Sequence, residues 1–216
     1  MTTLTTTEAG LDLDTRFERP ADESQIRRAA AALRAKGYTV EVVDTPEQAR
    51  VLVNDRLPAD RSVFTVSSET LRVSGLDEDI NASGRYDALR PKLVALQQEG
   101  RIDEMRSLGG APGVVVGSLH AVTEDGRLLA ASGSGSQLAL YSFGAAEVVW
   151  VVGAQKIVPD LDTAMRRIET YAYPREDARM RAAHGVPALL SKILIIDNEM
   201  FENRCSLILV REAIGF

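Results

Sequence analysis

The alternation of hydrophobic and polar positions along the chain predicts a series of helices and strands. Apolar residues recur every three to four positions in 22–36, which is the spacing of one helical face, and Gly37 suits the end of that helix. The next apolar runs are short and predict strands at 38–43 and 62–66, with a short helix at 46–54 between them. Helices that alternate with strands are typical of an α/β domain with a mostly parallel sheet flanked by helices.

The second half of the chain continues this alternation and indicates the centre of the sheet. The run Glu147–Val152 is apolar at successive positions, as expected for a strand covered on both faces. Asp125-Gly126 predicts a hairpin, because both central residues of a type I′ turn need positive φ. This hairpin and the two closing strands predict a partly antiparallel, and therefore mixed, sheet. The remaining predicted strands are 114–116, 119–123, 127–131, 192–197 and 204–211, and the remaining helices are 137–143 and 161–172, the latter with Asp160 as N-cap.

Differences in composition along the chain define the predicted domain organisation. Residues 1–20 are rich in threonine and lack periodicity, so we expect a disordered N-terminal tail. Residues 21–216 contain no repeat or low-complexity linker and are predicted to form a single domain. Within it, residues 84–108 are charged and helical in pattern, with breaks at Pro91 and Gly100, and we expect a helical insertion beside the sheet.

Composition argues against several functional classes. The formal net charge of −6, with basic residues scattered among acidic ones, argues against nucleic-acid binding. A single cysteine, Cys205, and two histidines provide no disulfide framework, no cysteine-ligated cluster and no expected metal site. The N-terminal sequence lacks the features of a signal peptide, and the longest apolar run, Val148–Val152, is too short to span a membrane. We therefore expect a soluble cytoplasmic protein.

Three predicted strand ends carry polar residues, and ligands of open α/β sheets bind beyond such ends. The first is the loop Gly133-Ser134-Gly135-Ser136-Gln137, which precedes a predicted helix. Its glycines allow close backbone approach to a ligand, and the helix N-terminus and serine hydroxyls favour a phosphate or carboxylate. It is neither a Walker loop nor a dinucleotide fingerprint, because no Gly-Lys-Ser/Thr follows and Leu138 replaces the third glycine. The alternative is a tight turn in which Ser136 only caps the helix.

The other two strand ends add further hydroxyl groups and an amine. In Ser67-Ser68-Glu69-Thr70, the hydroxyls of Ser67, Ser68 and Thr70 are candidate ligand-binding groups, and helix capping by Ser67 is the alternative. Lys156 follows the predicted central strand. Its amine could pair with an anion or, if desolvated, act as a general base or a Schiff-base amine. The alternative is a lysine that extends from the strand end to water.

Two residues near the predicted hairpin, and the single cysteine, are further candidates. Glu124 could act as a nucleophile or an acid–base group, whereas turn chemistry accounts for its neighbour Asp125. Strand alternation places His120 on the same face as Glu124, but a lone histidine is more often structural, so His120 is a minor candidate. Cys205 alternates with leucines and is expected to be a buried, inert thiol.

The run from Gly117 to Gln137, with its Thr-Glu-Asp-Gly turn, and the element Gly153-Ala-Gln-Lys-Ile-Val-Pro159 resemble the LUD domain. This is the family of lactate-utilisation protein C and its uncharacterised bacterial relatives, and the resemblance extends from about Ser62 to Phe216. It implies a fold like that of ribose-phosphate isomerase, glucosamine-phosphate isomerase and the CoA-transferases. Members of that group bind sugar phosphates, CoA esters or nucleotides, and some CoA-transferases use a glutamate nucleophile, which gives Glu124 an analogue.

The resemblance also links the chain to oxidation of L-lactate to pyruvate alongside iron–sulfur oxidoreductase partners. The chain departs from the clearest lactate-utilisation members in the loop 133–137 and in the insertion 84–108, and it has no cysteine cluster of its own. Fold analogy alone does not fix chemistry. The leading hypothesis is a protein that binds an anionic small metabolite or nucleotide, as an accessory component of lactate or organic-acid utilisation.

Two rival hypotheses stay open. In one, the chain is a CoA- or acyl-transferase or an ATP-dependent ligase that uses Glu124 as its nucleophile or base. In the other, it is a non-catalytic interaction subunit that docks through residues 84–108. A homo-oligomer is compatible with each hypothesis. The sequence specifies no cofactor, does not identify the ligand, and does not separate catalysis from binding.

Overall fold

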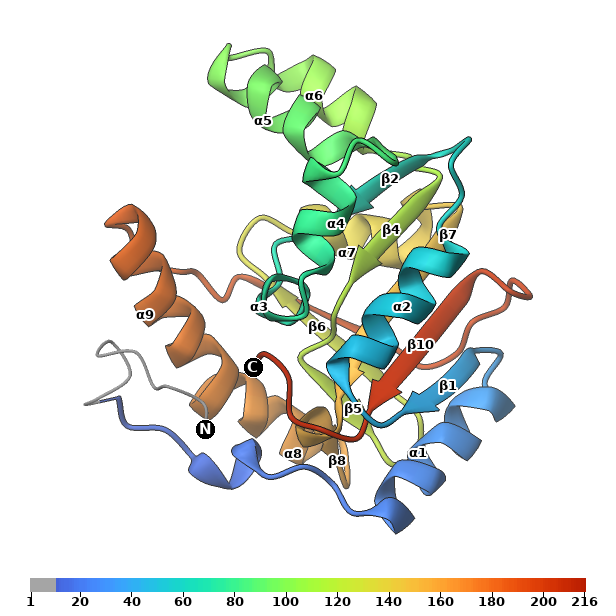
Figure 1. The fold of residues 1–216 in the computed structure, drawn as a ribbon. Helices are drawn as coiled ribbons and strands as arrows, with labels where there is room; N and C mark the ends of the chain where they lie inside the picture. Colours follow the sequence, from blue (N-terminus) through green and yellow to red (C-terminus); the bar gives the residue numbers. More distant parts are fainter. Residues whose placement is uncertain (1–10) are drawn as a thin grey trace.

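The structure of residues 11–216 is a computed structural model, in which six strands form a main sheet (Figure 1). Neighbouring strands of this sheet run parallel to one another, which confirms the predicted mostly parallel sheet. In spatial order the strands are β1 (Thr39–Val43), β10 (Cys205–Val210), β7 (Glu147–Gly153), β4 (Val114–Gly117), β2 (Ser62–Thr65) and β3 (Asp87–Ala88).

A second sheet, of four strands within the same residues, contains the antiparallel pairs. Its order is β8 (Ile157–Val158), β5 (Ala121–Thr123), β6 (Leu128–Ser132) and β9 (Lys192–Ile196). β5 and β6 form the predicted hairpin, but its turn is not the expected type I′ turn. Gly126 has φ +84°, whereas Asp125 does not have positive φ, and the Gly126 N–H donates to the Thr123 carbonyl at 2.9 Å. Glu124 and Asp125 are therefore the central residues of the turn, and Gly126 follows them.

The two closing strands do not pair with each other, contrary to the prediction. β10 lies between β1 and β7 in the main sheet, whereas β9 pairs with β6 at the edge of the second sheet. Burial explains the separation, because β10 is almost wholly buried and suits a central position, while β9 keeps Lys192 and Ile195 exposed.

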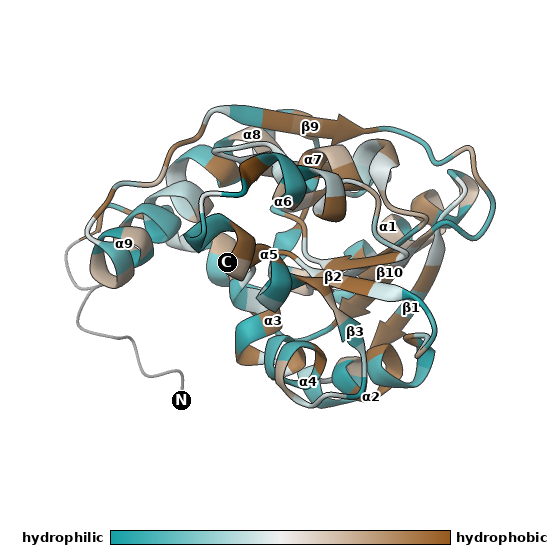
Figure 2. Cartoon of the chain, turned by 90° about the horizontal axis from the view of Figure 1, so that it is seen from above, coloured by the Kyte–Doolittle hydropathy of each residue, from teal (hydrophilic) through white to brown (hydrophobic). Residues whose placement is uncertain are grey.

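Helices cover the main sheet on both faces. β7 shows the arrangement, since Val149 and Val151 point to one face while Val148, Trp150 and Val152 point to the other. The first face packs against α2 (Pro46–Arg56), α3 (Glu69–Val73) and α4 (Leu76–Ala82). The second packs against α1 (Glu23–Ala35), α7 (Ser136–Ala139) and the second sheet. Figure 2 shows the result for the main sheet, in which the largely hydrophobic strands β2 and β10 lie between helices that carry many hydrophilic residues.

The outer face of the second sheet packs against a long helical segment that contains a wide turn. α8 (Leu161–Arg167) continues through a π-helical turn at Ile168–Ala172 into α9 (Tyr173–His184). The predicted helix ends at Ala172, but the observed one continues to His184. Its last part was not recognisable from periodicity, because none of the residues of α9 is buried. A second π-helical turn, at Leu140–Gly144, continues α7.

The expected insertion forms a helical hairpin of α5 (Leu89–Gln98) and α6 (Ile102–Gly109), which projects from the main sheet (Figure 1). Gly100 separates the two helices as predicted. Pro91 does not break the pattern, because it lies in the first turn of α5, where its missing N–H needs no partner. None of the residues Ile102–Gly109 is buried.

The N-terminal segment lies partly within the described residues and is ordered there. Thr15–Glu18 forms a 3₁₀ turn (η1), and Phe17 is buried with its ring centroid 6.3 Å from that of Tyr171. Residues 11–20 therefore differ from the disordered tail expected for 1–20, because one aromatic side chain anchors them, and residues 1–10 lie outside the described part. Among residues 11–216, no helix is long and apolar enough to span a membrane.

Candidate functional site

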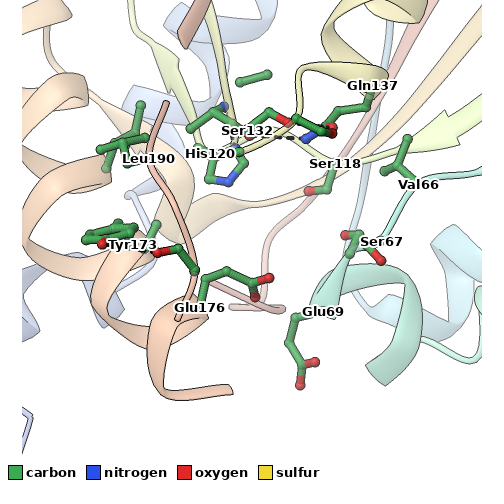
Figure 3. A pocket seen from close by; sticks show the side chains of 18 of the residues that line it. Val66, Ser67, Glu69, Ser118, His120, Ser132, Gln137, Tyr173, Glu176 and Leu190 are labelled. Atoms are coloured by element: carbon green, nitrogen blue, oxygen red, sulfur yellow. Dashed lines mark hydrogen bonds between the residues drawn. The ribbon is translucent and has the colours of Figure 1, made fainter. Parts of the chain in front are cut away.

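A cavity of about 660 Å³ lies beyond the carboxyl ends of β2 and β4, where the main sheet faces the second sheet and α9 (Figure 3). Its volume lies in the range typical of sites for small organic ligands. Aliphatic and aromatic side chains form much of the wall. The polar part of the wall consists of Ser67, Ser68, Glu69, Arg90, Ser118, His120, Ser132, Ser134, Ser136, Gln137, Tyr141, Lys156, Tyr173, Glu176 and Arg179.

Lys156 is the most deeply buried basic group in this wall. It ends a 3₁₀ turn at Ala154–Lys156 (η3), directly after β7, and only 1% of the residue is exposed. Its Nζ donates to Thr70 Oγ1 at 2.9 Å and to Ser118 Oγ at 3.0 Å. No carboxylate of the described residues lies within ion-pair distance of Nζ. Burial, and secondarily the positive charge of Arg167, hold the pKa of Lys156 well below its ordinary value of 10.5.

The two hydroxyl groups around Lys156 are themselves held by the backbone. Ser118 Oγ donates to the Val151 carbonyl at 2.7 Å, and Thr70 Oγ1 donates to the Ile214 carbonyl at 3.3 Å. Gln155 secures the same C-terminal segment, because its Nε2 donates to the Ile214 carbonyl at 2.9 Å. The surroundings of the amine are therefore formed by β4, β7, α3 and the C-terminal segment together.

His120 faces the cavity from the start of β5, and the ring is held in one tautomer (Figure 3). The backbone N–H of Ala131 donates to His120 Nδ1 at 3.1 Å, so the neutral ring carries its proton on Nε2. Burial, with the nearby charges of Lys156 and Arg167, lowers the pKa of His120 to about 3. The ring is thus a neutral hydrogen-bond donor at physiological pH. No described residue accepts a hydrogen bond from Nε2.

Arg167 supports the wall from behind and is a second buried basic group. It is fully buried in α8, and its Nε donates to the Gln155 carbonyl at 3.2 Å. One terminal nitrogen donates to the His120 carbonyl, and the guanidinium stacks 5.2 Å above the Tyr171 ring. The other terminal nitrogen has no hydrogen-bond partner among the described residues. Burial lowers the pKa of Arg167 to about 10.

Arg90 brings a cation to the cavity from the helical insertion. Its terminal nitrogens donate to the Thr65 carbonyl at 3.0 Å and to Ser67 Oγ at 2.6 Å, which fixes a half-buried guanidinium at the end of β2. Within residues 11–216, no carboxylate lies within 4.0 Å of this guanidinium, whereas most other arginines of the chain have such a partner. Its charge is thus free to attract an anion.

The hydroxyl groups beyond β2 have separate roles. Ser67 Oγ accepts from Arg90, and the Thr70 hydroxyl accepts from Lys156. Ser68, rather than Ser67, is the N-cap residue of α3, and its side chain makes no capping hydrogen bond. The alternative of simple capping therefore does not account for these three hydroxyl groups.

The loop Gly133–Gln137 lines the cavity with all of its residues except Gly135, and hydrogen bonds within the loop occupy several of its polar groups. Gly135 has φ +87° as the N-cap of α7, and its N–H donates to Ser132 Oγ at 2.9 Å. The Ser136 N–H donates to Ser134 Oγ at 3.3 Å, and Gln137 Nε2 donates to the Ala131 carbonyl at 3.1 Å. Two backbone N–H groups expected to meet an anion are thus already occupied. The side chains of Ser134, Ser136 and Gln137 contribute to the wall instead.

Glu124 does not line the cavity, although it and His120 flank the same strand, β5. It lies at the opposite end of β5, where it accepts hydrogen bonds from Arg28 Nε at 2.7 Å and Gln25 Nε2 at 2.9 Å. The hydrogen bond from Arg28 lowers the pKa of Glu124. The expected junction of Glu124 with the other candidates is not formed, because the turn end of an antiparallel hairpin points away from the carboxyl ends of the main sheet.

Cys205 is buried on β10, and its thiol donates to Glu199 Oε2 at 3.0 Å. Burial raises the pKa of this thiol, which disfavours the reactive thiolate. No group of three or more His, Cys, Asp or Glu side chains in the described residues could hold a metal ion.

Sequence reasoning missed Arg90, Ser118 and Arg179 as lining residues. Arg90 and Arg179 lie on helices α5 and α9, away from the strand ends where ligands were expected. Ser118 follows β4 directly, and the same rule of polar strand ends applied to that strand would have found it.

Comparison with known proteins gives one family and a structural neighbour. The model of the LUD domain family matches residues 26–192. A crystal structure of a DUF162 family protein from Deinococcus radiodurans is similar to this chain, with a TM-score of 0.52 and 12% sequence identity. The match covers 88% of this chain and 99% of that chain. At this identity the likeness shows the fold, and it confirms the predicted α/β class. No curated protein matches the chain.

Proposed function

This chain belongs to the LUD domain family, and on that premise we propose that it binds a small anionic metabolite in the cavity, through Arg90. The observation that carries this proposal is the guanidinium of Arg90, fixed at the cavity wall by Thr65 and Ser67 without a carboxylate partner among the described residues. A guanidinium with free charge and a fixed orientation binds carboxylates and phosphates well.

The rest of the wall supports a ligand that also has an apolar part. Val66, Leu119, Ile168, Leu190 and Phe216 line the cavity together with the polar groups. Binding sites for small molecules commonly combine such a wall with a few well-placed polar groups. The ligand that fits this combination is an acid with an aliphatic or aromatic body. Membership of the LUD domain family supports a place for this ligand in organic-acid utilisation, lactate included.

Calorimetric titration against carboxylic acids, sugar phosphates, nucleotides and CoA esters tests the proposal. We expect Arg90→Gln to weaken binding by about 10- to 150-fold, because hydrogen bonds to charged groups contribute about 1.5–3 kcal/mol. The matched control is Arg27→Gln, which removes an exposed arginine of α1 outside the cavity and should leave affinity unchanged. Unchanged affinity in Arg90→Gln, or no ligand in any of these classes, would contradict the proposal.

A second candidate function is that of an interaction subunit, favoured by the projecting hairpin of α5 and α6. This hairpin exposes Val94, Ile102 and Leu108. Such a surface could contact a partner protein, such as the iron–sulfur oxidoreductase implied by the family. The test is affinity capture from the host lysate with the wild-type chain and with Val94→Glu. A partner, identified by mass spectrometry, that is captured by the first and lost by the second would support this function.

The transferase alternative has no support from the geometry of Glu124. Its carboxylate is occupied by Arg28 and Gln25 and lies outside the cavity wall. A nucleophile must contact the ligand, so Glu124 has no part in the proposed site.

A further inference from the structure

We propose that Lys156 reacts through its amine with the carbonyl group of an oxo acid in the cavity, forming an imine. The inference rests on the proposed function and names its ligand class, an acid with an aldehyde or ketone group. It is carried by the hydrogen-bond partners of Lys156, by its complete burial, and by its position in the cavity wall.

The two partners of Lys156 can only accept hydrogen bonds from it. The hydroxyl of Ser118 has one proton, which is donated to the Val151 carbonyl. The hydroxyl of Thr70 likewise donates its proton to the Ile214 carbonyl. Lys156 Nζ must therefore supply the hydrogen atom in both contacts, and two of its N–H bonds are used.

This arrangement suits a neutral amine better than an ammonium ion. An ammonium ion has three N–H donors and, when fully buried, needs a counter-charge as well. Here it would find two uncharged acceptors, with the positive charge of Arg167 nearby. The carboxylate of Glu69 favours the charged amine, but it accepts from Arg72 Nε at 2.8 Å. A neutral amine instead satisfies both acceptors and retains its lone pair, and Lys156 is one of the residues that line the cavity.

His120 completes the arrangement expected around a reacting carbonyl group. Its Nδ1 is occupied by Ala131, so its proton is on Nε2 at the cavity wall. A neutral N–H donor of this kind polarises a carbonyl oxygen without protonating it. Arg90 can hold the carboxylate of the same ligand, and the apolar wall can hold its body.

The reaction needs no oxidant, reductant or other reactant. The lone pair of Nζ attacks the carbonyl carbon, a C–N bond forms, and the C=O π electrons move to oxygen. That oxygen receives one proton from Nζ, which gives a neutral carbinolamine. The C–O bond then breaks, and the oxygen leaves as water with the second Nζ proton. The products are one imine and one water molecule.

Reductive trapping tests the inference directly on the full-length protein. The protein is incubated with glyoxylate or 4-methyl-2-oxopentanoate and sodium cyanoborohydride near pH 7.4, and modified peptides are mapped by mass spectrometry. Lys36, Lys92 and Lys192, together with the terminal amine, serve as internal references. We expect trapping at Lys156 to exceed that at each lysine reference by up to about 1,000-fold, because an amine in water is only about 0.1% neutral at this pH.

Variants and carbonyl-free analogues separate the two proposals. Lys156→Met should abolish the trapped adduct, whereas Lys92→Met, which changes an exposed lysine on α5, should retain it. Calorimetry with 2-hydroxy-4-methylpentanoate, which lacks the carbonyl group, measures binding alone. If oxo and hydroxy acids both bind and no adduct forms on Lys156, the imine is excluded while the proposed function stands. If neither acid binds and no adduct forms, the proposed function fails for organic acids as well.

Discussion

Two buried basic side chains, Arg204 and Lys156, have opposite kinds of surroundings. Arg204 pairs with Glu199 at 2.8 Å, and both side chains are less than a tenth exposed. Its other donors reach the carbonyls of Leu140, Tyr141 and Ala145. Lys156 is buried more completely but has two uncharged hydroxyl partners and a cavity beside it.

The contrast separates a structural cation from an amine that we propose to be neutral and reactive. Arg204 has a counter-ion and backbone acceptors, so its burial holds β10 to the π-helical turn Leu140–Gly144. Among residues 11–216, Lys156 has neither a counter-ion nor a backbone acceptor, so the desolvation of its amine is not offset. This destabilising burial occurs at the wall of the cavity. Perturbed groups of this kind cluster at functional sites.

The largest effect is expected for Arg204→Met. Removing one partner of a buried ion pair leaves Glu199 without its counter-ion, which typically costs about 3–5 kcal/mol. The measurement is the free energy of unfolding from urea titration. The control is Arg211→Met, which breaks exposed contacts with Glu23 and Asp44 and should cost less than about 1 kcal/mol. Similar losses of unfolding free energy in the two variants would contradict the structural role of the Arg204–Glu199 pair.

Lys156→Met is expected to stabilise the protein by about 1 kcal/mol near neutral pH, because an apolar side chain replaces a desolvated amine. The Thr70 and Ser118 hydroxyls keep their carbonyl partners in this variant. The pH dependence has a definite sign. The pKa of Lys156 is lower in the folded than in the unfolded chain, so the wild type gains stability as the pH rises towards 10.5.

The advantage of Lys156→Met should therefore shrink and then reverse as the pH is raised from about 7 to about 10, because the wild type gains about 1.4 kcal/mol per pH unit while only its unfolded state is protonated. Thermal unfolding of both proteins across this range measures it, with Lys92→Met as the exposed control. A variant that is strongly destabilised at every pH would mean that Lys156 is a structural cation like Arg204.

The smallest effect is expected for Glu124→Gln. Its pair with Arg28 lies at the surface, where such pairs contribute less than about 1 kcal/mol. Glu124 also lies outside the cavity wall, so affinity for any ligand of the cavity should not change. Urea titration and calorimetry check the two statements. Loss of binding in this variant would show that Glu124 contributes to the ligand site, contrary to its position outside the cavity wall.

The elements that could be predicted from sequence are those with a strong apolar period or complete burial. α1 and β7 are of this kind, since α1 repeats its apolar residues on one face and β7 is apolar at every position after Glu147. The short helices α3 and α4 and the polar helix α9 give no such signal. The sequence also did not predict that β9 and β10 belong to different sheets, because strands that follow one another in sequence need not pair.

The site was partly accessible by the same reasoning. Lys156 and Ser67 follow strands of the main sheet, and the rule that ligands bind at strand ends located both at the cavity. The rule misplaced Glu124, because β5 belongs to an antiparallel hairpin. The turn of this hairpin, where Glu124 lies, points away from the cavity. Arg90 was missed because its significance lies in the absence of a carboxylate nearby, which depends on the folded arrangement of the described residues.

The π-helical turn at Ile168–Ala172 determines which side of the following helix, α9, faces the cavity. A π turn contains one residue more than an α turn, so deleting one residue there would rotate α9 by about 100° relative to α8. Tyr173, Glu176 and Arg179, which line the cavity along one side of α9, would then turn away from it. A single inserted or deleted codon can thus change which side chains meet the ligand, while the packing of α8 on the second sheet stays the same.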